Sequence, residues 1–417
     1  MGFARLQPRR RLTGPRTGPR TGPRTGRRYG FLALAALLSA AGASACTAPE
    51  SGRAAPPAAS PPASPSKAAR GFTLVASGDV LPHDSVIARA RDDATDPTAD
   101  GYDFRPMLAA VRPVVSAADL AICHMETVYG ADGDYRGYPF FTSPPQIARG
   151  LAATGYDGCS TASNHSLDDG ADGIRRTLDA MDTAGLVHHG SARTERESTT
   201  PARLRAGGAE VAHLAYTYDT NGRPQPEGQP WAVRLIDEER IVADARAARR
   251  AGADVVVLSL HWGTEWQTEP DDRQLALARS LTAATTGGRP DIDLILGTHA
   301  HVPQAYEKVN GVWVIYGMGD QIAGPMFDYT GARDHRGNMG TIGRFTFAPP
   351  KTPGGRWDVV RAEYVPQWYD TDDGRVVNLP AALADDPGRD DYRAVSETIT
   401  EAVLGRGAAR DGLVAAR

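Results

Sequence analysis

The stretches DVVVLSLHWG (residues 254–263) and DLILGTHAH (residues 293–301) decide the fold class of this chain. Each is a run of strand length in which apolar residues follow one another instead of alternating with polar ones. Such runs are typical of strands buried on both faces, as in parallel sheets. Histidine follows the apolar residues in both stretches: His261 in the first, and His299 and His301 in the second. Because ligands of open α/β sheets gather outside the carboxyl ends of the strands, the same stretches indicate where a functional site lies.

Apolar runs of this kind recur from residue 71 onward, and helical patterns lie between several of them. Helices are predicted at about residues 169–184, 237–250 and 271–284. Asp168 and Asp169 offer N-cap chemistry to the first helix, and Gly185 offers a C-terminal stop. Alternation of strand and helix implies an α/β fold. The runs between about 311 and 366 have no long helices between them, which predicts hairpins in a mixed sheet or in a second packed sheet.

The N-terminal 45 residues have the layout of a secretory signal peptide. A Gly/Pro/Arg repeat, TGPRTGPRTGPR (residues 13–24), precedes Arg27, Arg28 and the short apolar run FLALAALL (residues 31–38). This is a positive region followed by a hydrophobic region. We therefore expect an exported protein whose residues 1–45 take no part in the fold.

Cys46 indicates how the exported protein is attached to the cell membrane. The segment ASACTA (residues 43–48) resembles a bacterial lipobox, whose cysteine becomes the lipidated mature N-terminus, although Ala43 stands where leucine is usual. Residues 46–70 are rich in Pro, Ala and Ser, which predicts a semi-extended linker. We expect a lipid anchor at Cys46 on the cell membrane. The alternative is cleavage near Ala45, which would release a soluble secreted protein.

Charge and cysteine content narrow the functional classes. The net charge is −4, and all nine basic residues of the first 45 are arginines without an acid among them, so the folded part is more acidic still. Duplex binding depends on neutralisation of phosphates by Lys and Arg, so nucleic acid is not expected as a partner.

Cys123 and Cys159 lie on two predicted strands. Outside the cytosol they can form a disulfide, and the alternative is two buried thiols.

Polar side chains with metal-binding capacity follow the predicted strands at comparable positions. Two carboxylates, one amide and four imidazoles make up the set: Asp79, Glu126, Asn164, His165, His261, His299 and His301. Carboxylate oxygen combined with imidazole nitrogen suits divalent Zn, Mn or Fe. Seven groups are more than one tetrahedral ion needs and are enough for two ions. Such a pair lowers the pKa of bound water to near 7.

Other histidines are weaker candidates. His83 lies four residues after Asp79, His124 lies two residues before Glu126, and His189 lies in a predicted loop. Each is a candidate substrate contact beside the metal site. For a single histidine, a structural hydrogen bond is the competing interpretation.

Six motifs occur in an order that resembles the bacterial CapA family, the poly-γ-glutamate capsule synthesis proteins of the PgsA type. They are SGDV (77–80), HMET (124–127), SNHSLDDG (163–170), HWGTEW (261–266), GTHAHVPQ (297–304) and YGMGD (316–320). The resemblance covers roughly residues 72–325. It departs from the family at His124 and Met125, where Asn-Leu is typical, and at YGMGDQ, where a Tyr-Ser-Leu-Gly-Asn-Phe type of segment is typical.

The resemblance implies a calcineurin-like metallophosphatase fold, a four-layer αββα sandwich, with a dinuclear metal centre in a domain spanning residues 71–370. Residues 371–417 would form a C-terminal extension, a loop and a polar helix without an assigned role. Asp79 and Glu126 would be carboxylate ligands, with Glu126 as the bridge. Asn164 and His261 would bind the second ion, and the two histidines of GTHAH would divide between the ions. His165 would be the proton donor or charge stabiliser.

Two functions follow from the resemblance. The first is a metal-dependent hydrolase of a phosphoester or γ-glutamyl amide in the cell envelope, linked to capsule or poly-γ-glutamate metabolism. The second is a non-catalytic accessory protein for making or exporting an anionic envelope polymer, working with capsule-synthesis membrane proteins. A third interpretation, a degenerate domain that binds no metal, requires the seven side chains to have other roles.

Overall fold

The computed structural model describes residues 69–131, 133–352 and 355–416. The expected signal segment, Cys46 and nearly all of the linker lie outside these residues. Within the described part of the chain, every helix is too short or too polar to cross a bilayer.

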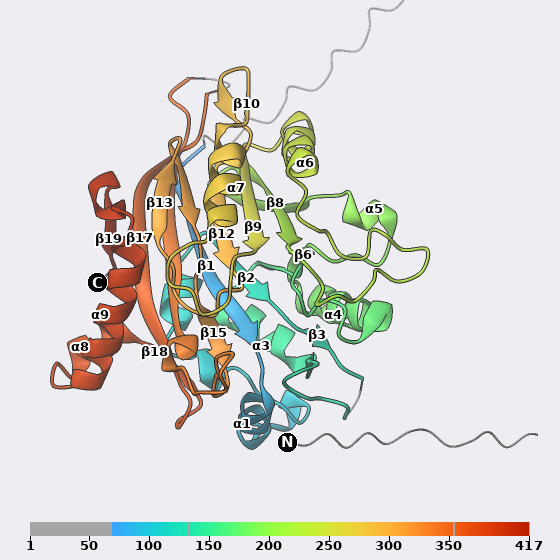
Figure 1. Ribbon diagram of the computed structural model, residues 1–417, viewed down its shortest axis with the longest axis vertical. Coiled ribbons are helices and arrows are strands. Elements are labelled where there is room, and N and C mark those ends of the chain that lie inside the picture. Colours follow the sequence, from blue (N-terminus) through green and yellow to red (C-terminus); the bar gives the residue numbers. More distant parts are fainter. Residues whose placement is uncertain (1–68, 132, 353–354, 417) are drawn as a thin grey trace, which may run out of the picture. The chain divides into compact units, whose positions relative to one another are not determined.

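Two large sheets form the centre of the described chain (Figure 1). The first contains, in spatial order, β18 (Arg375–Asn378), β17 (Asp358–Asp370), β16 (Met339–Ala348), β1 (Phe72–Leu81), β2 (Leu120–Met125), β5 (Gly158–Ser160) and β6 (Val187–His189). In addition, β15 (Asp320–Ala323) pairs with β1, and β19 (Leu413–Ala415) pairs with β17. The second contains β13 (Tyr306–Val309), β14 (Val312–Ile315), β12 (Leu294–Thr298), β9 (Val255–His261), β8 (Ala209–Thr217) and β7 (Ala202–Ala206).

The two sheets pack face to face, and helices cover their outer faces. Along β1, Leu74 packs into the core between the sheets, whereas the next residue, Val75, packs against the helices. The first sheet is covered by α1 (Asp84–Asp92), α2 (Arg112–Ser116), α3 (Gln146–Thr154) and α4 (Gly170–Ala184). The second is covered by α6 (Glu238–Arg250) and α7 (Asp272–Ala283). Strands buried on both faces explain the continuous apolar runs. The expected four-layer αββα sandwich is confirmed.

The three predicted helices are present, and aspartates begin two of them as N-caps. Asp237 caps α6, and Asp271 caps α7 in a capping box with Gln274. The N-cap prediction for α4 was wrong in its chemistry, because Asp169 occupies the N-cap position without a side-chain capping bond. Its carboxylate pairs with Arg176 instead, and Asp168 accepts hydrogen bonds from the Phe141 N–H and the His165 ring.

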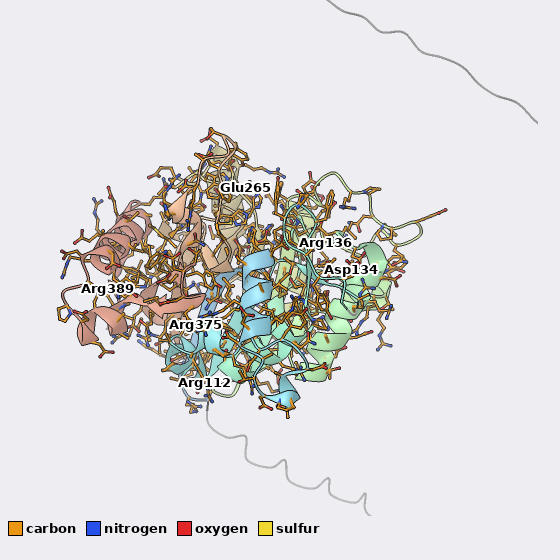
Figure 2. All side chains as sticks on the ribbon, turned by 90° about the horizontal axis from the view of Figure 1, so that it is seen from below. Arg112, Asp134, Arg136, Glu265, Arg375 and Arg389 are labelled. Atoms are coloured by element: carbon orange, nitrogen blue, oxygen red, sulfur yellow. A yellow bond between two sulfur atoms is a disulfide. The ribbon has the colours of Figure 1, made fainter. Side chains whose placement is uncertain are left out.

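The segment after residue 370 is part of the same core. The first sheet has nine strands and the second has six, and side chains of β16 and β17 belong to the core between the sheets. Helices α8 (Leu379–Asp385) and α9 (Asp390–Leu404) pack against these strands, and the Ile399 side chain is fully buried there (Figure 1). Arg375 of β18, labelled in Figure 2, binds both carboxylate oxygens of Asp93 at 2.8 and 2.9 Å. The expected extension therefore contributes strands and core side chains.

Cys123 and Cys159 form a disulfide between β2 and β5. They are directly paired in the parallel register of the two strands, with their Cα atoms 4.4 Å apart. Of the two interpretations of these cysteines, the structure has the disulfide.

Strand direction places the polar motifs together. In the first sheet β1, β2 and β5 are parallel, and in the second β8, β9 and β12 are parallel. Their carboxyl ends meet at one end of the sandwich, where Asp79 pairs in register with Asp320 at the start of β15. Gly78 makes this possible, because a Cβ there would lie 1.7 Å from the Gly319 carbonyl oxygen. The pairings of β1 with β15 and with β2 both shift register at Asp79. Such irregularities often lie next to functional sites, where they change the direction of a side chain.

Candidate metal centre

The seven side chains expected to form the site converge, and none is more than 7% exposed. Oδ2 of Asp79 accepts a hydrogen bond from the His299 N–H at 3.0 Å and lies 3.8 Å from Nδ1 of His301. Nε2 of His261 lies 2.9 Å from Oδ1 of Asn164 and 3.8 Å from Oε1 of Glu126. These residues come from both sheets, so the centre bridges the sandwich.

The loop after β12 holds two of the imidazoles in an uncommon backbone conformation. His299 has φ 95° and His301 has φ 57°, in the region that favours glycine. Two hydrogen bonds from the β9 loop fix this loop: the Trp262 N–H donates to the Thr298 carbonyl, and the Trp266 N–H donates to the Ala300 carbonyl. Non-glycine residues in this region cluster at functional sites, where surrounding contacts hold them.

Two carboxylates at the centre were not assigned roles from the sequence. Asp320 is fully buried, and its Oδ1 lies 3.0 Å from Nδ1 of His301. A carboxylate on the second ring nitrogen orients a metal-binding imidazole. Glu265, labelled in Figure 2, offers a carboxylate oxygen within 4.8 Å of ligand atoms of His299 and His301. Both residues lie in motifs named above, YGMGD and HWGTEW, so the motifs contained the signal and the assignment missed it.

His165 lies beside the metal-binding candidates and is held by a carboxylate. Its Nδ1 is 2.6 Å from Oδ2 of Asp168, and its ring stands edge-on to Phe141 with the centroids 4.7 Å apart. The bond at Nδ1 leaves Nε2 as the ring nitrogen available to a substrate.

The three candidate substrate contacts have different positions. The ring of His83 packs against Phe141, 5.1 Å between centroids, at the edge of the centre. His124 lies inside the centre, where its ring stacks on His261 at 4.8 Å. The contacts of His189 lie elsewhere: its Nδ1 accepts from the Ala215 N–H at 2.9 Å, and it lines a cavity of about 790 Å³ together with Val187, His188 and Gly190. A substrate contact at His189 stays a prediction.

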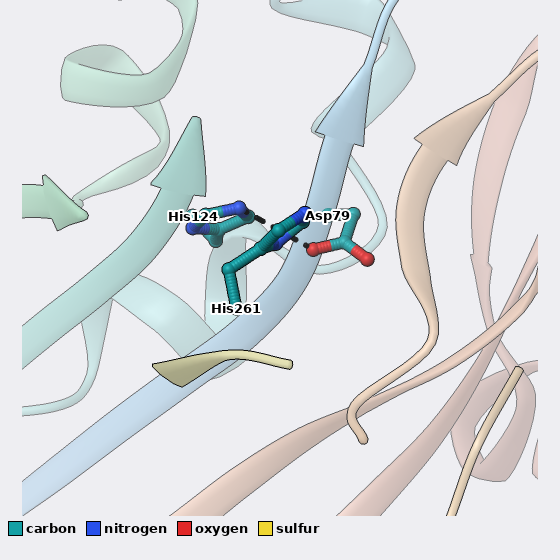
Figure 3. Close-up of side chains that lie close together, drawn as sticks. All are labelled: Asp79, His124 and His261. Carbon is teal, nitrogen blue, oxygen red and sulfur yellow. Dashed lines mark ion pairs between the residues drawn. The ribbon is translucent and has the colours of Figure 1, made fainter. Parts of the chain in front are cut away.

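Several buried polar atoms at the centre have no hydrogen-bond partner among the described residues. They are Oδ1 of Asp79, both carboxylate oxygens of Glu126, Nε2 of His124, Nδ1 of His299 and Oδ2 of Asp320. A buried polar group without a partner costs free energy, and a buried charge costs more unless it is paired or coordinates a metal. The donor set of carboxylate oxygen and imidazole nitrogen thus fits divalent cations. Asp79, His124 and His261 offer three ligand atoms within 4.8 Å of one another (Figure 3).

Residues 73–325 match the family model described as "Bacterial capsule synthesis protein PGA_cap". This chain belongs to the PGA_cap family. The resemblance to capsule synthesis proteins is confirmed by this match.

Relatives of this PGA_cap chain carry names from capsule and polymer synthesis. "PGA biosynthesis protein CapA" of Bacillus subtilis is 29% identical over 200 residues, 46% of this chain and 49% of that protein. "Capsule biosynthesis protein CapA" of Bacillus anthracis is 26% identical over 178 residues, 42% of each chain. "Probable polyglutamine synthesis accessory protein Rv0574c" of Mycobacterium tuberculosis is 29% identical over 239 residues, 53% of this chain and 58% of that protein. This chain spans about half the length of these relatives.

Solved structures similar to the PGA_cap chain include phosphoesterases. A calcineurin-like phosphoesterase, YfkN, of Bacillus subtilis has 15% identity and a TM-score of 0.41, and the match covers 79% of this chain and 99% of that one. A 5'-nucleotidase precursor of Thermus thermophilus has 15% identity and a TM-score of 0.43, over 79% and 59%.

Burial dominates the electrostatics of the PGA_cap centre. Burial, and after it the neighbouring Asp320, raises the pKa of Asp79 well above its usual range. Burial and then Asp79 raise the pKa of Glu126 in the same way. Burial also lowers the pKa of His124 to about 3, and burial with the neighbouring imidazoles lowers the pKa of His261 and His299 well below its ordinary value. Without cations, burial therefore disfavours the charged forms of these two carboxyls and of these three imidazoles. Neutral imidazole is the form that binds metal.

Aromatic side chains lie beside the centre. Phe141 and Trp266 belong to one apolar cluster, and the Trp266 ring lies 6.0 Å from that of His301. Phe140, 48% exposed, carries the guanidinium of Arg223 over its ring at 4.5 Å. Aromatic rings and one arginine therefore lie near His165.

Proposed function

We propose that this PGA_cap protein is a metal-dependent hydrolase of the cell envelope, which cleaves a phosphoester or a γ-glutamyl amide in capsule or poly-γ-glutamate metabolism. The observation that carries the proposal is the set of buried, unpartnered carboxylate and imidazole atoms at one end of the sandwich. Asp79, Glu126, Asn164, His261, His299 and His301 would hold two divalent ions. When bound, the ions would supply an activated water and neutralise the charge that develops in the transition state.

The protein's own residues would position and protonate the substrate. Hydrolysis forms a bond from a water oxygen to the phosphorus or carbonyl carbon, breaks the bond to the leaving oxygen or nitrogen, and transfers a proton to the leaving atom. His165 would donate that proton from Nε2, and the bond between its Nδ1 and Asp168 supports this role. The Arg223 guanidinium, 3.6 Å from the second oxygen of Asp168, lies beside the path of an anionic substrate.

Asp320 would fix the orientation of a ligand. Its bond to Nδ1 of His301 directs Nε2 of that ring toward an ion. Burial disfavours the imidazolium, but Asp320, Glu126 and Asp79 together raise the pKa of His301 well above its ordinary value. Ions bound at this centre would have to displace that proton, so metal binding should release protons.

The proposal is tested with purified protein whose metal content is measured. We expect divalent ions to copurify with the protein and hydrolysis of an activated aryl phosphate or a γ-glutamyl anilide. Asp79→Ala and His299→Ala should each lose both the activity and bound metal. His213→Gln is the matched control, because His213 is a fully buried imidazole that bonds Ser259 instead of the centre. Wild-type activity in the Asp79 and His299 variants would contradict the proposal.

The alternative is an accessory role without turnover. The name of the Mycobacterium tuberculosis relative, a "synthesis accessory protein", is the supporting observation. In that role the centre would bind a carboxylate of the polymer without cleaving it. Metal content without hydrolysis of either substrate would favour this alternative. It further requires that deletion of the partner synthase abolish the phenotype of deleting this protein.

We further propose that the protein acts outside the cytoplasm on a lipid anchor at Cys46. The support is the signal-like segment, the lipobox-like ASACTA and the Pro/Ala/Ser-rich stretch that follows. Replacement of Cys46 by alanine should move the protein from the membrane fraction to the medium. Membrane association that is unchanged in this variant would contradict the anchor.

A further inference from the structure

His124 is a buried imidazole that the proposed function does not use. It is the next-to-last residue of β2, and it is 2% exposed. Nδ1 lies 2.7 Å from Oγ of Ser160, its register partner on β5. Nε2 has no hydrogen-bond partner among the described side chains and backbone, and it lies 3.7 Å from Oδ1 of Asp79, which also has none. A side chain that served packing alone would not need this nitrogen to face a carboxylate.

Ser160 is the hydrogen-bond partner of Nδ1 of His124. The Ser160 hydroxyl also has the Cys123 carbonyl as an acceptor at 3.5 Å, and when it donates there its oxygen accepts from Nδ1–H of His124. In that arrangement the neutral imidazole has its lone pair on Nε2. A hydrogen bond at the other ring nitrogen is how proteins fix the tautomer of a metal-binding histidine. The disulfide at Cys123 and Cys159, one residue before each of these two side chains, ties their strands together.

Nε2 of His124 lies beside Asp79 and His261. Figure 3 shows the Asp79 carboxylate and the rings of His124 and His261 close together, with a dashed line between His124 and Asp79. Their ligand atoms lie within 4.8 Å of one another. Two ligand atoms on one tetrahedral ion are roughly 3.3 Å apart, because metal–nitrogen and metal–oxygen bonds are about 2.0–2.1 Å long. The 3.7 Å between Nε2 and Oδ1 of Asp79 is close to that separation.

We propose that His124, through Nε2, is a ligand of the ion held by Asp79 and His261. The inference rests on the proposed metal centre and adds a ligand to it. It also regroups the centre, because Asp79 and His261 then share one ion. A site with two imidazoles and one carboxylate favours Zn, Fe or Co over Mg or Ca, which prefer oxygen ligands.

The test compares His124→Asn with wild type as full-length protein, stripped of metal and titrated with Zn²⁺ or Co²⁺. Asparagine is short enough to keep a bond to Ser160 while removing Nε2. We expect His124→Asn to weaken one of two binding steps by at least about 100-fold, since loss of an outer-shell partner alone costs about 10–100-fold. The visible absorption of the Co²⁺ form should change as well, because it reports the ligands around the ion.

Two further variants separate ligation from folding. Ser160→Ala keeps Nε2 and removes its orienting partner, so it should weaken the same step by a smaller factor. His213→Asn removes a fully buried imidazole outside the centre and should leave both steps unchanged. If His124→Asn is unfolded by circular dichroism, His124→Gln replaces it, and the Ser160→Ala result must still show the selective loss.

Each outcome decides the ligand assignment, the proposed hydrolase or both. Two unchanged binding steps and an unchanged Co²⁺ spectrum in folded His124→Asn would overturn the ligand assignment and leave the proposed hydrolase intact. Wild-type protein that binds neither cation would overturn both. Selective loss of one step, with wild-type affinity at the other, would establish His124 as a ligand.

Discussion

Nδ1 of His165 lies 2.6 Å from a carboxylate oxygen of Asp168, three residues further along the chain. The same oxygen accepts a hydrogen bond from the Phe141 N–H, so the carboxylate is fixed from a second segment. A positioned imidazole of this kind is what proton donation to a leaving group requires.

The proton-donor role of His165 predicts a dependence on the leaving group. His165→Ala should lower kcat by about 10²–10⁴-fold for an alkyl phosphate, whose leaving group needs a proton. The loss should be much smaller for a nitrophenyl phosphate, whose leaving group is stable as an anion. Asp168→Asn should show the same pattern with smaller factors, and metal content should stay at the wild-type level in both variants. Equal losses for the two substrates would assign His165 to another role.

Because His213 is buried, we expect the folded protein to lose stability in acid. Burial lowers its pKa from 6.5 to about 4, so the folded protein binds this proton less tightly than the unfolded chain does. The stabilisation is fully present above pH 6.5 and is lost as the pH falls through about 4. Its size is on the order of 3 kcal/mol.

Urea unfolding of metal-free protein at pH 7 and at pH 4 measures this effect. His213→Gln should show a smaller fall in the free energy of unfolding between the two pH values than wild type. Other groups also titrate in this range, so the difference between the two proteins is the quantity that tests the prediction. An equal fall in both would show that His213 does not contribute.

The disulfide predicts a measurable contribution to stability. Cys123 and Cys159 are 36 residues apart in sequence, and closing a loop of that length stabilises the fold by about 2–4 kcal/mol. The double variant Cys123→Ala/Cys159→Ala should lose about that much in urea unfolding under non-reducing conditions. With reductant present, wild type and the variant should approach each other. Identical unfolding curves without reductant would contradict the prediction.

Because the C-terminal helix α9 packs into the core, we expect residues after 370 to contribute to the stability of the fold. Ile399 is fully buried between α9 and the first sheet, so Ile399→Ala should lower the free energy of unfolding by about 2–5 kcal/mol. Glu397 on the same helix is exposed, and Glu397→Ala should change the free energy of unfolding by less than about 0.5 kcal/mol. A single unfolding transition that shifts only with the Ile399 change would identify one cooperative core. Equal stability of the two variants would mean that α9 is dispensable.

The class of the fold and the ends of its strands follow from the sequence alone. Continuous apolar runs mark strands that are buried on both faces, because a strand exposed to water on one face would alternate. Polar residues after these runs located the centre, since the carboxyl ends of parallel strands meet at one edge. Helices were expected from Asp237 and from Asp271, and the structure shows that both residues are N-caps, a contact between residues only a few positions apart.

Which polar groups meet depends on the tertiary structure. Asp79 and Asp320 are 241 positions apart and become neighbours because β15 pairs with β1. The ring of His124 stacks on that of His261, because β2 lies beside β1, whereas His189 lies on the edge strand β6. The pairing of strands distant in the chain is fixed by packing of the whole sandwich. No local pattern in the sequence specifies that pairing.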